Sequence, residues 1–336
     1  MATPPQARSN ERRFLLTGAK GFIGAWIVKN LVERGDHPWI FDLDREAHRL
    51  HALLSDEQLA RITFVLGDVT QFEELDRAVA EHGITHVIHL AAIQVPACAA
   101  NPRLGAQINV GGTLNVFEVA RRRRDLVRRI VYASSAAVFG PEEFYEAATV
   151  PEGAPLEPGT HYGVFKQCNE GNARVYYITE GISSVGLRPW AVYGVGRDVG
   201  VTSGPTKAIK AAVVGRDYTI RFTGGLDLQY VNDTAQLFLR CAESELPGAR
   251  VYTPRGTVTQ IADFIAALER DSPQARGRIK AVGPALPIAH NLDNSALIRD
   301  LGAVPHTPLA QGIRETREIF ARLHSVGALT NEDLDL

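Results

Sequence analysis

The sequence predicts a doubly wound α/β domain, built on a parallel sheet and joined to a second, smaller lobe. Through the first half, apolar runs of strand length alternate with amphipathic stretches, which is typical of βαβ units. A glycine-rich turn lies between the first apolar run and the first helical pattern. We expect strands at residues 14–17, 39–42, 63–66, 86–91, 129–134 and 184–188, with a further one at 251–253.

The sequence pattern changes after Leu187. Gly and Pro punctuate residues 189–205, and the segments that follow are shorter and less regular. We therefore expect the large domain to comprise residues 12–187 plus 226–254, and a mixed lobe to comprise residues 188–225 plus 255–325. Beyond Pro254 this lobe is predicted to be mainly helical, and residues 326–336 are predicted to form a loose tail outside both lobes.

Composition narrows the class of protein. The 336 residues include 36 Lys and Arg against 38 Asp and Glu, a net charge of −2, so there is no global field to attract nucleic acid. The basic run at 121–124 is interpreted as a solvated helix end that complements its dipole. No apolar run is long enough to span a membrane and no secretion signal is present, so we expect a cytoplasmic protein without a membrane partner.

The three cysteines predict neither a disulfide nor a metal site. Cys98, Cys168 and Cys241 are odd in number, widely separated and without C-x-x-C spacing. They are interpreted as small core residues.

The glycine-rich turn predicts a dinucleotide site. Residues 17–24 read TGAKGFIG, directly after a strand and opening a helix. Such glycines let the backbone approach a pyrophosphate at the helix N-terminus, where unsatisfied N–H groups point at it. The residues assigned to this cradle are Gly18, Gly21, Phe22, Ile23 and Gly24. The large domain is therefore predicted to be a dinucleotide-binding Rossmann domain, and the smaller lobe to bind the substrate.

Asp42 ends the second predicted strand and sets the choice of cofactor. A carboxylate there accepts hydrogen bonds from both ribose hydroxyls of NAD and repels the 2′-phosphate of NADP. NAD is therefore the expected cofactor, and Arg45 is the residue that would instead favour NADP.

Two further strand ends carry candidate cofactor contacts. Asp68 and Val69 follow the third strand and can reach an adenine edge, although a plain turn Asp remains an alternative. The fourth strand ends in small side chains that let the backbone lie against a flat cofactor, or that simply pack. These residues are Leu90, Ala91 and Ala92.

A tyrosine and a lysine predict acid/base chemistry. Tyr162 and Lys166 stand four residues apart, hence on one face of a helix. A nearby ammonium favours the phenolate and lowers the pKa of a tyrosine, which makes it a usable base near neutral pH. Upstream, Ser134 and Ser135 end the fifth strand at the carboxyl edge of the sheet, where a hydroxyl can hold the reacting oxygen.

Together these motifs resemble the extended short-chain dehydrogenase/reductases, the NAD-dependent epimerase/dehydratase family. Besides the glycine loop and Asp42, the matching pieces are GDV at 67–69, HLAA at 89–92, INVGGTLNV at 108–116, VYASSAAVFG at 131–140, HYGVFK at 161–166 and LRPWAVYG at 187–194. The resemblance implies that Tyr162 is the acid/base and that Lys166 binds the nicotinamide ribose and lowers the tyrosine pKa. Ser135 would be the partner of the substrate oxygen, and Asn109 a structural residue beside the cofactor.

The family resemblance also implies a homodimer. Its members commonly pair two helices of each subunit in a bundle, here the segments 104–120 and 162–179.

The chain departs from the nucleotide-sugar branch of this family in three places. Ala136 and Ala137 stand where dehydratases carry an Asp-Glu pair. Ala191 replaces the Asn, and Leu226 the Arg, with which epimerases hold a sugar diphosphate. A buried diphosphate without such partners would be poorly compensated.

We therefore expect an NAD-dependent oxidoreductase that moves hydride between NAD and a carbinol carbon of a small sugar, sugar acid or polyol without a nucleotide. Two alternatives stay open: a UDP-sugar 4-epimerase that takes its phosphate contacts from Arg197, Lys207 or Arg221, and an idle NAD-binding protein. The intact catalytic residues argue against the last. Candidate substrate contacts are Gln94, Ser134, His161, Trp190, Arg197 and Thr202.

Overall fold

A seven-stranded parallel sheet forms the core of the computed structural model, which describes residues 11–335. The strand order is β10-β6-β5-β4-β1-β2-β3, and every neighbouring pair is parallel. The doubly wound α/β prediction is thereby confirmed. The strands are β1 (Phe14–Thr17), β2 (Trp39–Asp42), β3 (Thr63–Leu66), β4 (His86–His89), β5 (Arg129–Ala133), β6 (Ser184–Leu187) and β10 (Ala249–Tyr252).

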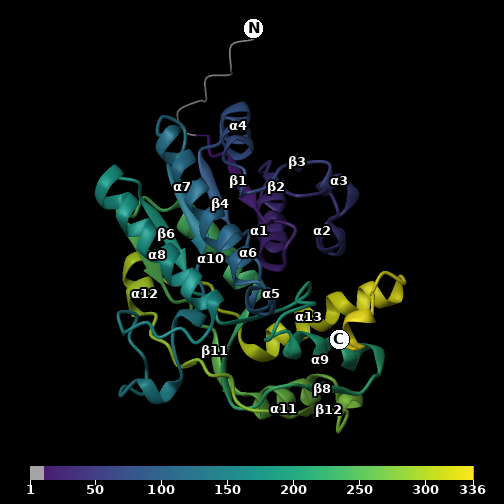
Figure 1. The fold of residues 1–336 in the computed structure, drawn as a ribbon. Helices are drawn as coiled ribbons and strands as arrows, with labels where there is room; N and C mark the ends of the chain where they lie inside the picture. The colour runs from purple at the N-terminus through teal and green to yellow at the C-terminus, as the bar shows by residue number, and fades with distance from the viewer. Residues whose placement is uncertain (1–10, 336) are drawn as a thin grey trace.

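Helices cover both faces of this sheet (Figure 1). On one face α1 (Phe22–Glu33) packs against α10 (Val231–Glu243), and on the other α4 (Phe72–His82) and α8 (His161–Glu180) flank α7 (Gly112–Arg122). Strand β1 lies inside the sheet, and because both faces are covered its Leu15 and Leu16 are fully buried. Between the strands and these helices run α2 (His48–Leu53), α3 (Asp56–Leu59), α5 (Val95–Ala100) and α6 (Pro102–Ala106).

The second lobe contains strands as well as helices. A three-stranded sheet joins β7 (Ala191–Tyr193), β9 (Gly225–Tyr230) and β11 (Thr257–Gln260), and β8 (Tyr218–Ile220) pairs with β12 (Ile279–Ala281). Its helices are α9 (Gly204–Val214), α11 (Ile261–Asp271), α12 (Ser295–Leu301) and α13 (Leu309–Ser325). We expected the chain beyond Pro254 to be mainly helical, and this prediction overlooked β11 and β12. Both strands are too short to show an alternation of apolar and polar residues.

The strand β9 lies outside the large sheet, although its residues were assigned to the large domain. It pairs with β7 and β11, and only the helix that follows it, α10, returns to pack on α1. The division of the chain into two lobes stays a prediction.

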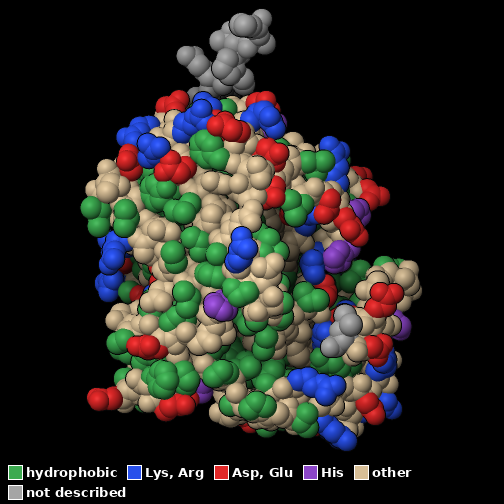
Figure 2. Space-filling model, in the orientation of Figure 1, with side chains coloured by type: hydrophobic (Ala, Val, Ile, Leu, Met, Phe, Trp, Pro, Cys, Tyr) green, Lys and Arg blue, Asp and Glu red, His purple; other side chains and the backbone are tan. Residues whose placement is uncertain are grey.

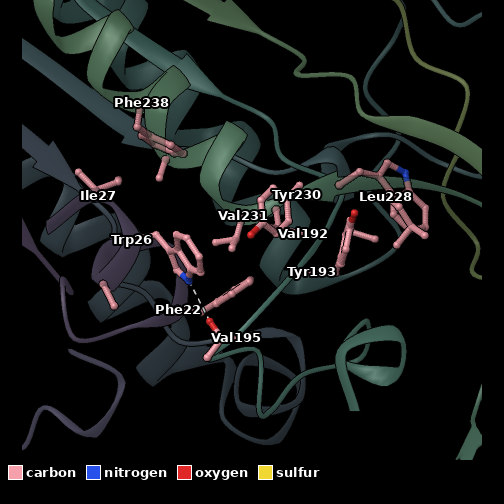
Figure 3. Close-up of a cluster of buried hydrophobic side chains, with 14 of the residues drawn as sticks. Phe22, Trp26, Ile27, Val192, Tyr193, Val195, Leu228, Tyr230, Val231 and Phe238 are labelled. Atoms are coloured by element: carbon pink, nitrogen blue, oxygen red, sulfur yellow. Dashed lines mark hydrogen bonds between the residues drawn. The ribbon is translucent and has the colours of Figure 1, made fainter. Parts of the chain in front are cut away.

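An aromatic cluster joins the second lobe to the first helix of the sheet domain. Trp26 of α1 donates its indole N–H to the carbonyl oxygen of Val195, at 2.9 Å, just beyond β7 (Figure 3). Tyr230 lies edge-on to the same indole, with ring centroids 6.0 Å apart. These contacts fix where the chain after β7 passes the glycine loop.

The chain beyond residue 326 packs on α9, contrary to the loose tail that we expected. Lys210 of α9 binds Asp333 at 2.8 Å, and Leu334 is buried. Nothing in the sequence pattern indicates this, because the segment is short and acidic and its cationic partner lies far away in the chain.

The surface carries both signs of charge. Figure 2 shows basic and acidic side chains interspersed over the face drawn. The run at 121–124 lies at the C-terminal end of α7, where Arg123 forms a double hydrogen bond with Asp76 at 2.7 Å. Across residues 11–335 we find no helix that is long and apolar enough to cross a membrane, and no group of three or more potential metal ligands.

The homodimer and the cytoplasmic location stay predictions. The helix expected at the dimer interface, α8, does expose apolar side chains: Val164, Val175 and Ile178 are 46%, 51% and 72% exposed.

Candidate active site

A cavity of about 970 Å³ lies at the carboxyl ends of the large sheet. Its walls come from the segments that follow β1 to β5 and from the start of α8. The second lobe adds Trp190, Val192 and the loop 286–288. Ligands of open α/β sheets bind at this edge, so the cavity is the candidate site.

The glycine loop fits a dinucleotide. Gly18 has a φ of +67°, and a Cβ there would lie 2.7 Å from the Cα of Ala91. A Cβ at Gly24 would lie 2.5 Å from the Cα of Ala19, so this glycine lets α1 close on the loop. Gly21, the N-cap of α1, has no side-chain cap, which leaves the first N–H groups of the helix for a bound anion.

Asp42 lies in the cavity wall beside a lysine that the sequence analysis did not single out. The Nζ atom of Lys20 is 3.7 Å from a carboxylate oxygen of Asp42, and Lys20 also binds Asp44. Lys20 lines the cavity whereas Arg45 does not. Its place within the glycine loop was the available signal, because that loop forms one wall of the cavity.

The other predicted cofactor residues line the cavity, with one exception. Phe22, Ile23, Asp68, Val69, Leu90, Ala91 and Ala92 all contribute to its wall.

Asn109 is buried behind the wall instead. It accepts from the backbone N–H of Ile93 at 2.8 Å and donates to the carbonyl oxygen of Ile93 at 2.9 Å. It belongs to a π-helical turn, Gln107–Gly111, a type of distortion that is frequent near functional sites. Asn109 thus positions the backbone after β4 and is not placed to touch the cofactor.

The structure brings Ser135, Tyr162 and Lys166 together in one wall of the cavity. Helix α8 approaches the end of β5 closely because Gly163 has no side chain: a Cβ there would lie 2.2 Å from the carbonyl oxygen of Ala137. Tyr162 and Ser135 both line this wall, and Ser135 acts to lower the pKa of Tyr162. The Nζ atom of Lys166 donates to the carbonyl oxygen of Ala133 at 2.6 Å and lies 5.4 Å from the centre of the Tyr162 ring.

Burial governs the protonation of this group. The pKa of Lys166 falls to about 8 because its ammonium is desolvated. Burial raises the pKa of Tyr162 above its usual range, against the opposing effects of the hydrogen bond with Ser135 and the charge of Arg197. The expected depression of the tyrosine pKa by Lys166 is therefore not seen in this structure, where desolvation outweighs the nearby charges.

Ser134 is bound to a buried ion pair. Its hydroxyl donates to Glu170 at 2.5 Å, one turn along α8 from Lys166. Arg188 holds both oxygens of Glu170, at 2.8 and 2.7 Å. All three residues are buried, and although Ser134 contributes to the cavity wall, its hydroxyl is engaged by Glu170. The sequence analysis did not single out Glu170. Its spacing of four residues from Lys166, which places both on one face of the helix, was the available signal.

The remaining substrate candidates divide between the cavity and the surface. Gln94, Trp190, Arg197 and Thr202 line the cavity, and Trp190 is fixed by a hydrogen bond from its indole to the carbonyl oxygen of Ala289 at 2.9 Å. His161 lies outside the wall, exposed, with its ring stacked on Phe165. As the first residue of α8 it points away from the face that carries Tyr162.

Comparison with known proteins agrees with this fold. The profile of the NAD dependent epimerase/dehydratase family matches residues 14–253, more than half of the chain. The chain therefore belongs to that family, and it is an NAD-dependent enzyme.

Relatives that are named as different kinds of enzyme align with nearly the whole chain. A UDP-glucose 4-epimerase of Mycolicibacterium smegmatis is 28% identical over 92% of this chain and 98% of its own. A partial consensus L-threonine 3-dehydrogenase superposes with a TM-score of 0.81 at 25% identity, covering 92% of this chain and 99% of its own. A UDP-glucose 4-epimerase of Thermus thermophilus, solved with NAD, has a TM-score of 0.77 at 25% identity and covers 92% and 98%.

Proposed function

We propose that the protein is an NAD-dependent dehydrogenase that oxidises a carbinol carbon of a small sugar, sugar acid or polyol, or reduces the matching carbonyl. The observation that carries the proposal is the apolar character of the positions at which the epimerase branch holds a sugar diphosphate. Ala191 and Leu226 are 1% and 0% exposed and belong to the core between the lobes. Ala136 and Ala137 line the cavity without an acid or base for dehydration.

The chain's own residues supply binding and proton transfer in this proposal. The substrate hydroxyl would sit between Ser135 and Tyr162, with Ser135 holding the oxygen and the Tyr162 oxygen taking its proton. Lys166, fixed by the carbonyl oxygen of Ala133, would hold the nicotinamide ribose beside Tyr162. Bound NAD supplies the hydride acceptor.

A substrate panel tests the proposal. The enzyme and NAD are incubated with free sugars, sugar acids and polyols, and NADH is followed by absorbance. UDP-glucose, UDP-galactose and UDP-glucuronate are incubated in parallel and the epimer ratio is read by NMR. We expect NADH from a free compound and no conversion of the UDP-sugars.

The second candidate is a UDP-sugar 4-epimerase. It is supported by the similarity of the chain to the UDP-glucose 4-epimerase of Mycolicibacterium smegmatis. Interconversion of a UDP-sugar pair at about 1 s⁻¹ or faster, the low end of ordinary turnover, would establish it and overturn the proposed dehydrogenase.

A further inference from the structure

The charges that line the cavity are unevenly distributed. Most follow β1, β2 and β3, where the glycine loop and Asp42 place the adenosine side of the cofactor: Lys20, Asp42, Asp44, Glu46, His48, Arg49 and Asp68. On the catalytic side the charged lining residues in the described chain are Lys166 and Arg197, both cations. Lys166 is held by a backbone carbonyl, which leaves Arg197 as the charge that faces a substrate.

Arg197 is desolvated and poorly partnered. Its Nη2 atom donates to the hydroxyl of Thr202 at 2.9 Å, while its Nε atom is buried without a hydrogen-bond partner. Among residues 11–335, no carboxylate lies within 4.0 Å of this guanidinium. The neighbouring Asp198 is bound to Arg49 at 3.1 Å instead.

The side chain of Arg197 is half-buried in the cavity wall, and partial desolvation without an anion is unfavourable for a cation. Burial lowers the pKa of Arg197, in the direction that opposes its charge. A buried charge is normally compensated by a partner. A guanidinium offers parallel N–H groups in a fork that matches one carboxylate. The structure thus holds a donor set for a single monovalent, planar anion.

The arrangement places this donor set close to the reacting group. Arg197 and Tyr162 line the same cavity, and the charge of Arg197 acts to lower the pKa of Tyr162. Gly200 lets Gln94 and Arg197 share the space beside it: a Cβ there would lie 2.3 Å from Oε1 of Gln94 and 3.1 Å from Nη2 of Arg197. A ligand that reaches both Arg197 and Tyr162 is therefore compact.

We infer that Arg197, oriented by Thr202, anchors the carboxylate of a small hydroxy acid whose hydroxyl lies at Ser135 and Tyr162. This inference rests on the proposed dehydrogenase function and narrows its substrate class from sugars, sugar acids and polyols to hydroxy acids alone. Free sugars and polyols carry no anion for Arg197. A sugar diphosphate brings two charged phosphates, for which this side of the cavity offers one free cation among the described residues.

Matched pairs of acids and neutral alcohols test the anchor. NADH formation is measured with glycerate and glycerol, 3-hydroxybutyrate and 1,3-butanediol, and gluconate and glucitol. We expect turnover of at least one acid and much slower turnover of its neutral partner. In Arg197→Gln, kcat/KM for that acid should fall by about 10- to 150-fold, the range for one charge-assisted contact, while the neutral partner changes little.

Two controls separate the anchor from general damage. Arg197→Lys keeps the charge but loses the fork, and should recover part of the acid preference. Arg276→Gln, an exposed arginine of the second lobe, should match the wild-type enzyme. Equal turnover of acid and neutral partner by the wild-type enzyme, or an unchanged acid preference in Arg197→Gln, would overturn the anchor while leaving the dehydrogenase proposal intact.

A binding measurement decides the anchor even if no compound is oxidised. Propionate, a monocarboxylate without a hydroxyl to oxidise, is titrated by calorimetry into the enzyme saturated with NADH. We expect binding to the wild-type protein that weakens at least about tenfold in Arg197→Gln. No binding, or equal binding by both proteins, would contradict the carboxylate anchor. A panel without any NADH formation would instead count against the proposed function.

Discussion

The two sides of the cavity are built in different ways. The cofactor side comes from the ends of β1 to β4, with glycines that bring backbone against backbone, as at Gly18 and Ala91. The catalytic side draws on residues from 94 to 288, and its side chains are held by partners behind them, such as Glu170 for Ser134. The first side is a local backbone feature that one stretch of sequence encodes. The second is a tertiary arrangement that depends on many distant contacts.

This difference predicts that substitutions on the catalytic side change turnover without changing cofactor binding. Tyr162→Phe removes a proton acceptor that acts only in the transition state, so kcat should fall by about 10² or more. The dissociation constant for NAD, measured by calorimetry, should stay within about twofold. Tyr177→Phe, an exposed tyrosine on the same helix, is the matched control. Near wild-type turnover by Tyr162→Phe would remove Tyr162 from the mechanism.

A histidine beneath both sides should make the fold sensitive to acid. His89 bridges Thr17 at 2.7 Å and Thr113 at 3.0 Å, and burial lowers its pKa from 6.5 to about 3. The unfolded chain takes up this proton below pH 6.5 and the folded chain does not, so stability is complete above pH 6.5 and declines as the pH falls towards 3. Between pH 7.5 and pH 5 this residue should remove about 2 kcal/mol from the free energy of unfolding.

Urea denaturation at both pH values checks the role of His89. His89→Gln should lose about 2 kcal/mol less than the wild-type protein between them, whatever its absolute stability. His324→Gln, on the surface of α13, should behave like the wild type. An unchanged pH dependence in His89→Gln would show that this histidine is not kept neutral by the fold.

On the cofactor side, the smallest expected effect concerns the choice between NAD and NADP. The wild-type enzyme should bind NAD at least about tenfold more tightly, or about 1.4 kcal/mol, because Asp42 repels a 2′-phosphate. Asp42→Ser should erase this preference by freeing Lys20, and the added substitution Lys20→Met should weaken NADP again.

Arg45→Met in the Asp42→Ser background distinguishes the two basic residues, with calorimetry as the measurement. We expect it to leave NADP binding unchanged, since Arg45 lies outside the cavity wall. Weaker NADP binding in that variant would make Arg45 the phosphate partner instead of Lys20.

The sequence allowed prediction of the cofactor side almost completely. The bounds of β1, β2 and β3 match the expected strands, because their apolar runs end at the turns that carry the site. The predicted strand from 86 to 91 is too long, because the backbone at Leu90 leaves β4 to follow the glycine loop. Most of what was missed lies in the second lobe and behind the catalytic helix. Neither the three-residue strand β8 nor the distant pairing of Glu170 with Arg188 has a periodic signal.

One arginine links the two sides of the cavity. Arg49 donates to the carbonyl oxygens of Lys20, at 3.3 Å, and of Gly196, at 2.8 Å, and it binds Asp198. It thus ties the backbone of the glycine loop to the residues on either side of Arg197. Any shift of that loop when the dinucleotide binds is transmitted to the guanidinium that we assign to the substrate. In kinetic terms, the enzyme should follow a compulsory order in which the dinucleotide binds first and leaves last.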